Sequence, residues 1–252
     1  MTTPAQKNNA YFGLSTGRLE ALSDGVLAIV ITLLILAFLD ADHDIADSPS
    51  MSSAEVVKVL LSFWPHLLGY VLSFVLIAIY WIIHHHMFHY IRRADRGLLW
   101  LNMLFLMCVA FVPFPTDLLS SCIEHESNVI VVLYGASHLI CGLTLAAVWC
   151  YATYDRRLVA EDIDISVLRA TTQTTLTGPA LYSIGIALSF VSTTAALVVY
   201  CIVPLLYIVP GRIDQMWLSI DHALESERNQ LHRTGGLLAG FRGNKQSANP
   251  SA

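Results

Sequence analysis

The fold of this chain is decided by the stretch Arg18–Leu39, which reads RLEALSDGVLAIVITLLILAFL. This apolar run is long enough to cross a bilayer, because a membrane-spanning helix needs about 20 residues. Its first turns nevertheless carry Arg18, Glu20, Ser23 and Asp24. Charged groups at membrane depth are costly, so they face protein or water and often mark function. At the membrane surface the same groups merely anchor the helix, and both interpretations remain open at this point.

One side of this predicted helix presents an apolar stripe with a single hydroxyl. Ile29, Thr32, Leu33 and Leu36 follow the i, i+3, i+4, i+7 spacing that places residues on one face of a helix. In an ordinary packed bundle, such a stripe is part of the core. If several copies of the chain met around an axis, the stripe would instead form the hydrophobic constriction of a pore. The stretch alone does not decide between these two structures.

The composition of the whole chain is that of a membrane protein with several spans. Hydrophobic residues make up 55% of the 252 residues and charged residues only 13%, which excludes a soluble domain. The formal net charge is −5 and no basic tract occurs, which argues against nucleic acid as a partner.

The sequence contains no pattern that indicates catalysis. We find no nucleophile–base pair, no Gly-rich phosphate loop and no paired intramembrane carboxylates, so neither an enzyme activity nor a cofactor is predicted. The five cysteines lack CxxC or CxxH spacing, and four of them lie in or near apolar runs, where they act as small hydrophobic residues. Two matching broken helices, the usual mark of an inverted-repeat transporter, are also missing from the sequence.

Hydropathy predicts six membrane-spanning helices joined by short polar segments. Pro65 lies early in the second span, where proline kinks a helix. The third span is expected to break late, at Pro113 and Pro115, and the fifth near Gly178 and Pro179. The predicted spans are Gly17–Leu39, Val56–Tyr90, Gly97–Leu119, Asn128–Tyr151, Arg169–Phe190 and Thr193–Val209.

The positions of lysine and arginine predict how the chain is oriented. Nearly all of them lie at the start of the first span or after the second, fourth or sixth span, and these positions share one side of the membrane. Only Lys58 lies on the opposite side. By the positive-inside rule, both termini are therefore cytoplasmic. Residues 1–16 and 216–252 are polar and are predicted to be unstructured cytoplasmic segments on either side of a transmembrane domain at 17–215. The acidic loop at 40–53 either is simply solvated or raises the local cation concentration.

A group of histidines ends the second predicted span. His85 and His89 are four residues apart on a helix, so both can reach one metal ion, but no HExxH pattern accompanies them. The topology places the polar ends of the first three spans at the same depth, so hydrogen bonding between these helices is better supported. The expected network consists of Arg18, Ser23, Asp24, His84 or His85, and Asn102.

Four segments in the first half of the chain together resemble the transmembrane protein 175 family, the lysosomal-type potassium channels. RLEALSD (Arg18–Asp24) resembles the Arg-x-x-x-Phe-Ser-Asp signature that opens the first helix of that family. YWIIHHHMF (Tyr80–Phe88) resembles its Trp-x-x-His-His stretch, and LLWLNMLFL (Leu98–Leu106) and PFPT (Pro113–Thr116) resemble its third helix. Leu22 stands in place of the signature phenylalanine, so this chain lacks an aromatic ring at a packing position.

The resemblance implies a prokaryote-type subunit with six transmembrane helices, an all-α membrane protein that forms a homotetramer. The first helix then lines a central pore that conducts K⁺, and other monovalent cations, passively across the cell membrane. Counting from Asp24, the narrowest apolar position falls on Ile29, and the next pore-facing positions fall on Thr32, Leu33 and Leu36. The polar network of the family carries over to Arg18, Ser23, Asp24, Trp81, His84, His85 and Asn102.

Two other functions stay open on the sequence alone. A proton-coupled or metal-ion transporter would use the histidines at the end of the second span, with His85 and His89 essential for transport. A non-conducting membrane scaffold or sensor is suggested by the absence of catalytic patterns. For the channel, the predicted partners are K⁺, membrane lipid and three further copies of the chain, and no metal cofactor is predicted.

Overall fold

The computed structural model describes residues 15–38, 52–122, 127–160 and 163–208. Predictions made for residues 1–14, for most of the acidic loop at 40–53 and for the tail at 216–252 lie outside the described residues. The described helices are α1 (Thr16–Leu33), η1 (Leu34–Phe38), α3 (Ser53–Ser62), α4 (Trp64–Tyr90), α5 (Arg96–Phe111), α6 (Pro113–Cys122), α7 (Asn128–Thr153), η3 (Tyr154–Arg156), α8 (Ile165–Ser189) and α9 (Thr193–Ile208).

All six predicted spans are helical in the structure, which confirms an all-α membrane protein. Within the described residues, four segments are by themselves long and apolar enough to cross a membrane: α1 with the start of η1, α4, α5 with α6, and α7 with η3. The other two predicted spans, α8 and α9, do not meet this criterion of length and apolar composition. Helix α9 is apolar but has only 16 described residues, and α8 is less apolar because serines and threonines interrupt its sequence.

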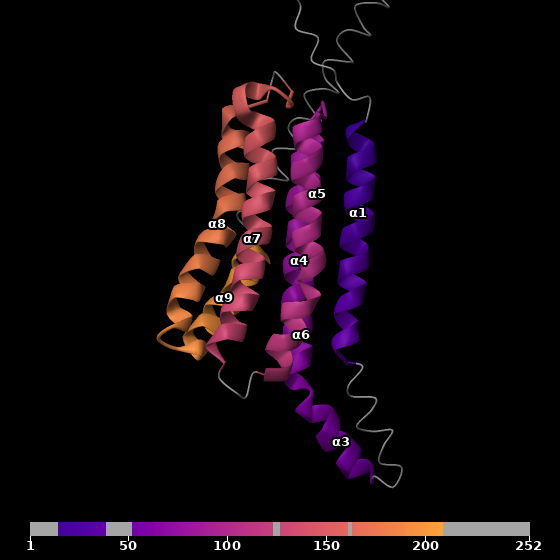
Figure 1. Cartoon of the computed structure of the whole chain (residues 1–252), viewed down its shortest axis with the longest axis vertical. Helices are drawn as coiled ribbons and strands as arrows, with labels where there is room; N and C mark the ends of the chain where they lie inside the picture. The colour runs from indigo at the N-terminus through magenta and orange to yellow at the C-terminus, as the bar shows by residue number, and fades with distance from the viewer. Residues whose placement is uncertain (1–14, 39–51, 123–126, 161–162, 209–252) are drawn as a thin grey trace, which may run out of the picture. The chain divides into compact units, whose positions relative to one another are not determined.

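The second predicted span is two helices, α3 and α4, and not one kinked helix. Pro65 lies in the first turn of α4, where no hydrogen bond is lost by its missing N–H, so it starts a helix here and does not bend one. A capping box starts α3: Ser52 and Glu55 exchange hydrogen bonds between side chain and backbone. The hydrogen bonds from Ser52 lower the pKa of the Glu55 carboxyl. Figure 1 shows that α3 points away from the axis of α4.

The third span breaks where the sequence predicts, because α5 ends at Phe111 and Pro113 opens α6. The fifth does not break. Helix α8 continues through Gly178 and Pro179, which corrects the predicted interruption. Tyr207 of α9 helps to satisfy the backbone there: its hydroxyl donates to the carbonyl oxygen of Thr174 at 2.6 Å and accepts from the N–H of Gly178 at 3.0 Å.

Helix α8 also begins at Ile165, earlier than the predicted start at Arg169. Asp164 caps it, because the Asp164 carboxylate accepts a hydrogen bond from the N–H of Ser166 at 2.8 Å. This hydrogen bond lowers the pKa of Asp164.

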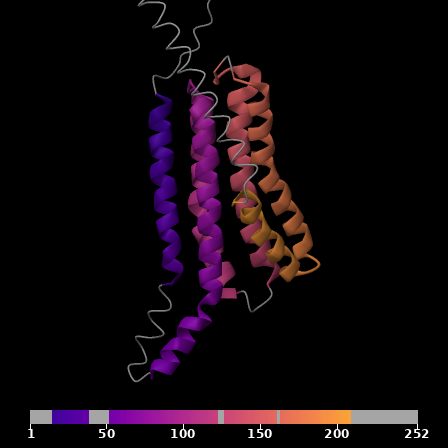
Figure 2. The same ribbon diagram turned by 180° about the vertical axis from the view of Figure 1, so that it is seen from behind.

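The helices are arranged so that α1 and α8 lie at opposite edges, with α4, α5 and α7 between them (Figures 1 and 2). Helix α7 packs against α5, α6, α8 and α9, and its side chains Tyr134, His138, Cys141, Val148 and Trp149 are completely buried. Among the described helices, α1 packs mainly against α4 and α5, through the face that carries its buried residues. The candidate site lies on this edge helix.

Candidate functional site

Helix α1 has a packing face and an uncovered face. The buried residues recur every three or four positions, the period expected for one side of a helix packed against neighbours. They contact α4 and α5. The buried positions of α1 are Leu19, Ser23, Leu27 and Val30, and Leu34 of η1 continues this face.

The predicted apolar stripe lies on the uncovered face. Ile29 is 59% exposed, Leu36 is 50% exposed and Leu33 is 40% exposed. Thr32 is also exposed, and its hydroxyl donates to the carbonyl oxygen of Ile29 at 2.7 Å. The interpretation of this stripe as core is therefore wrong for a single chain. An uncovered apolar face in a membrane protein is available to lipid, to another copy of the chain or to a pore.

A fully buried hydrogen-bonded chain fixes α1 to α4 and α5. The side-chain amide of Asn102 donates to the hydroxyl oxygen of Ser23 at 3.0 Å, and its carbonyl oxygen lies 2.9 Å from Nε2 of His84. Ser23 in turn donates to the carbonyl oxygen of Leu19 at 2.9 Å. Because the amide oxygen of Asn102 can only accept, Nε2 of His84 carries the proton. Three predicted network residues, one from each helix, are thus brought into contact.

Aromatic rings hold His84 in this position. Its imidazole stacks on Phe88 with ring centroids 4.3 Å apart, and on Phe105 of α5 at 5.7 Å. The ring is completely buried. Its orientation toward Asn102 is therefore set by packing as well as by the hydrogen bond.

A second, more exposed group of contacts lies beside this chain. The indole Nε1–H of Trp81 donates to Oδ1 of Asp24 at 2.8 Å. The ring of Trp81 stacks on His85 at 5.7 Å, and Nδ1 of His85 lies 2.9 Å from a carboxylate oxygen of Glu20. Glu20 was not predicted as a member of the network. Its spacing of four residues before Asp24 places it on the same side of α1, which is the signal that could have found it.

Arg18 is the predicted network residue that the structure does not connect. It is exposed, and within the described part of the chain no contact links it to the other six. Eleven residues, or about three helical turns, separate Arg18 from Ile29. Arg18 therefore lies on the uncovered side of α1.

The histidines at the end of α4 point toward different partners. His85 contacts Glu20, while Nε2 of His86 lies 3.2 Å from the hydroxyl of Thr171 on α8. The ring of His89 packs on Tyr90 at 5.1 Å. Across the described residues, no three side chains of His, Cys, Asp or Glu come close enough to hold a metal ion.

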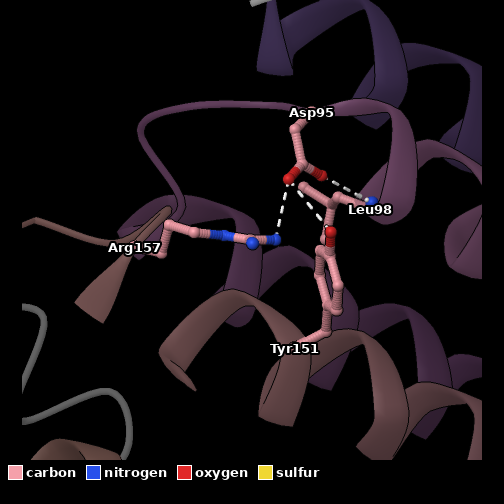
Figure 3. A network of polar contacts seen from close by, with 4 residues as sticks. All are labelled: Asp95, Leu98, Tyr151 and Arg157. Atoms are coloured by element: carbon pink, nitrogen blue, oxygen red, sulfur yellow. Dashed lines mark hydrogen bonds and ion pairs between the residues drawn. The ribbon is translucent and has the colours of Figure 1, made fainter. Parts of the chain in front are cut away.

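At the same end of the molecule, Asp95 joins the two halves of the chain (Figure 3). One carboxylate oxygen caps α5 by accepting from the N–H of Leu98 at 2.9 Å. The other accepts from the Tyr151 hydroxyl at 3.0 Å and from Arg157 at 2.8 Å. The guanidinium of Arg157 also lies 4.7 Å from the centre of the Tyr151 ring. No motif or spacing in the sequence predicts this contact, which links Asp95 to Tyr151 and Arg157.

Together, these features define a multi-pass α-helical membrane protein in which a polar network fixes an edge helix with an uncovered apolar stripe. Comparison with known proteins then identifies the family. The family model described as "Endosomal/lysosomal potassium channel TMEM175" matches residues 18–113. A protein of Chamaesiphon minutus named potassium channel is 38% identical over 178 residues, which is 70% of this chain and 85% of that protein.

A second relative, named potassium channel in Streptomyces collinus, is 37% identical over 194 residues, covering 76% of this chain and 91% of its own length. The crystal structure of a lysosomal potassium-selective channel TMEM175 homolog from Chamaesiphon minutus matches with a TM-score of 0.66 and 35% identity, over 76% of this chain and 95% of that one. This chain belongs to the TMEM175 family. The family is one of ion channels and not of enzymes.

Proposed function

We propose that this chain is one subunit of a homotetrameric channel that conducts K⁺ passively across the cytoplasmic membrane. The uncovered apolar stripe on α1 is the observation that carries the proposal. A helix that uses polar groups to fix one face, and leaves the opposite face apolar and exposed, suits a position around a central axis. The two bacterial relatives named potassium channels support the choice of ion.

In this proposal, four copies of Ile29 form the narrowest ring of the pore. A ring of apolar side chains excludes water when it is narrow, so an ion must lose part of its hydration shell to pass. K⁺ is less tightly hydrated than Na⁺ and passes at lower cost. Leu33 and Leu36 continue the apolar wall, and Thr32 adds the one hydroxyl on this face. Other monovalent cations pass the same apolar wall less readily than K⁺.

The polar network sets the rotation of α1 in this arrangement. Ser23 is fixed by Asn102, and Asp24 by Trp81, both on the side that faces the rest of the subunit. Rotation of α1 about its axis would break these hydrogen bonds before it moved Ile29 away from the pore. Arg18 lies on the uncovered side, so we assign its contacts to neighbouring copies of the chain.

The remaining exposed apolar side chains would contact lipid. Trp100 on α5 is 67% exposed, and Leu67 on α4 is 54% exposed, as expected for side chains at a membrane boundary. The excess of Lys and Arg on one side supports cytoplasmic termini. The channel domain then spans 17–215, between cytoplasmic segments at 1–16 and 216–252.

Cation flux into liposomes that contain the purified protein tests the proposal. We expect K⁺ flux to exceed Na⁺ flux in the wild type, and Ile29→Asn to wet the constriction and reduce this preference. Ile35→Asn is a matched control, because Ile35 is 51% exposed but does not belong to the stripe of Ile29, Thr32, Leu33 and Leu36. An unchanged ratio of K⁺ to Na⁺ permeability in Ile29→Asn would contradict the assignment of the pore face.

No observation favours the transporter that the sequence left open. That function needs His85 and His89 to act together, but His85 contacts Glu20 and His89 packs on Tyr90. A scaffold or sensor predicts no flux of either cation from folded, oligomeric protein, so the same liposome experiment distinguishes it from a channel.

A further inference from the structure

A small cavity lies inside the subunit, among α4, α7, α8 and α9 and away from α1. Its volume is about 20 Å³. A cavity needs roughly 10–15 Å³ on this scale to hold one water molecule. Most of its lining is apolar, but five polar side chains also reach it: Tyr80, His138, Thr175, Tyr182 and Tyr207.

Two of these side chains have a polar atom without a partner. Nε2 of His138 and the hydroxyl of Tyr182 are buried, and within the described residues neither has a hydrogen-bond partner. The two rings stack with centroids 5.2 Å apart and planes inclined by 19°. His138 belongs to α7 and Tyr182 to α8, so both unpartnered atoms lie at the contact between these two helices. Buried polar atoms in proteins nearly always have a partner, in protein or water.

The other nitrogen of His138 is already engaged. The Tyr80 hydroxyl lies 3.1 Å from Nδ1 of His138 and 3.1 Å from the His138 carbonyl oxygen. A hydroxyl has one proton, so when it donates to the carbonyl, Nδ1 is the donor and Nε2 holds a lone pair. When the hydroxyl donates to Nδ1 instead, Nε2 carries the proton. In both tautomers, Nε2 needs a polar partner that the described side chains do not supply.

One of the residues that line the cavity also has a backbone group without its usual helical partner. Pro179 has no N–H, so the carbonyl oxygen of Thr175, four residues earlier, loses its usual helical donor. One turn away, Tyr207 bridges Thr174 and Gly178. Thr175 itself lines the cavity. In membrane helices, ordered water commonly satisfies backbone groups that proline sets free.

We propose that this cavity binds one ordered water molecule, which bridges Nε2 of His138 and the hydroxyl of Tyr182. Water suits the site because it both donates and accepts, and it therefore fits either tautomer of His138. The cavity has room for one such molecule and not for a larger ligand. This site ties α7 to α8 inside the subunit and is independent of the proposed pore.

A map of the full-length protein at a resolution that shows water tests the proposal. We expect a peak within hydrogen-bonding distance of both Nε2 of His138 and the Tyr182 hydroxyl, and its loss in Tyr182→Phe. Tyr200→Phe is the matched control, because the Tyr200 hydroxyl donates to Val131 and does not line the cavity, so the peak should remain. A cavity without a peak, or a direct bond from Tyr182 to Nε2, would overturn the proposal.

Thermal unfolding of the same variants gives an independent measurement. Loss of a water-bridged hydroxyl removes a hydrogen bond, so Tyr182→Phe should lower the Tm by about 2–4 °C. Removal of an unpartnered buried hydroxyl instead leaves the Tm unchanged or raises it. A Tm for Tyr182→Phe equal to or above that of the wild type would contradict the bound water.

Discussion

Helices α1 and α7 are both long and apolar, but the chain covers them to different extents. In the apolar window of α7, 50% of the residues are buried, against 28% in α1. Helix α7 has neighbours on most of its sides, whereas α1 contacts the subunit through a single face. This difference indicates that α7 builds the subunit, while α1 presents a surface to something beyond it.

The polar residues of the two helices differ in the same way. In α7, His138 lies in mid-helix and its contacts are to side chains inside the same bundle. In α1, Ser23 and Asp24 lie near one end and fix the helix to α4 and α5, while the stripe from Ile29 to Leu36 contains one hydroxyl only. Polar groups thus stabilise the packed interior of the subunit around α7, whereas in α1 they fix the orientation of the helix.

The largest expected effect is the loss of stability when a buried tryptophan is replaced, compared with replacement of an exposed one. Trp149 on α7 is completely buried and its Nε1–H donates to Thr172 at 3.1 Å. Trp149→Ala should destabilise the subunit by about 3 kcal/mol, because it leaves a large cavity and removes the hydrogen bond to Thr172. Trp100→Ala is the control, since Trp100 is 67% exposed and its loss should cost little. Equal decreases in the free energy of unfolding of the two variants would contradict the contrast between core and surface.

A smaller effect is expected at the base of α1. Asp24→Ala removes the hydrogen bond from Trp81, a contact to a charged group that solvent screening should reduce to about 1 kcal/mol in each subunit. We expect the isolated subunit to stay folded but the proposed tetramer to dissociate, as measured by light scattering in detergent. Trp81→Phe removes the same bond from the other partner and should act alike. Intact tetramers of Asp24→Ala that have lost conduction would show that Asp24 acts in the pore and not in assembly.

The smallest effect concerns the contact between the two halves of the chain. Asp95→Asn keeps the cap of α5 but removes the charge that attracts Arg157, which is nearly half exposed. Exposed ion pairs contribute little, so the expected loss is about 0.5 kcal/mol and should shrink at high salt. Asp95→Ala also removes the cap and should cost more. Equal decreases of the Tm in Asp95→Asn and Asp95→Ala would show that the cap of α5 adds no stability beyond the ion pair with Arg157.

The features that could be predicted from sequence are those set by local periodicity. The apolar stripe on α1 follows from spacing, and the contacts among Ser23, His84 and Asn102 follow from their common depth at the ends of three spans. The break before Pro113 follows from the missing N–H of proline.

Other features depend on residues far apart in the chain. Proline both kinks helices and starts them, so Pro65 alone did not reveal that α3 and α4 are separate. The continuity of α8 through Pro179 depends on Tyr207, which only the fold brings near. Likewise, spacing places Glu20 on the same side of α1 as Asp24, but its pairing with His85 depends on how α1 and α4 pack together.

The most direct test of the pore assignment is whether ions reach Ile29 from water. Silver is a monovalent cation that binds thiolates, so it should block K⁺ flux through Ile29→Cys when it enters the pore. Ile35→Cys is one control, because Ile35 is 51% exposed and lies outside the predicted stripe; the wild type with its native cysteines is the other. We predict block in Ile29→Cys alone. Block of equal extent in Ile35→Cys, or none in Ile29→Cys at saturating silver, would contradict a pore lined by this face of α1.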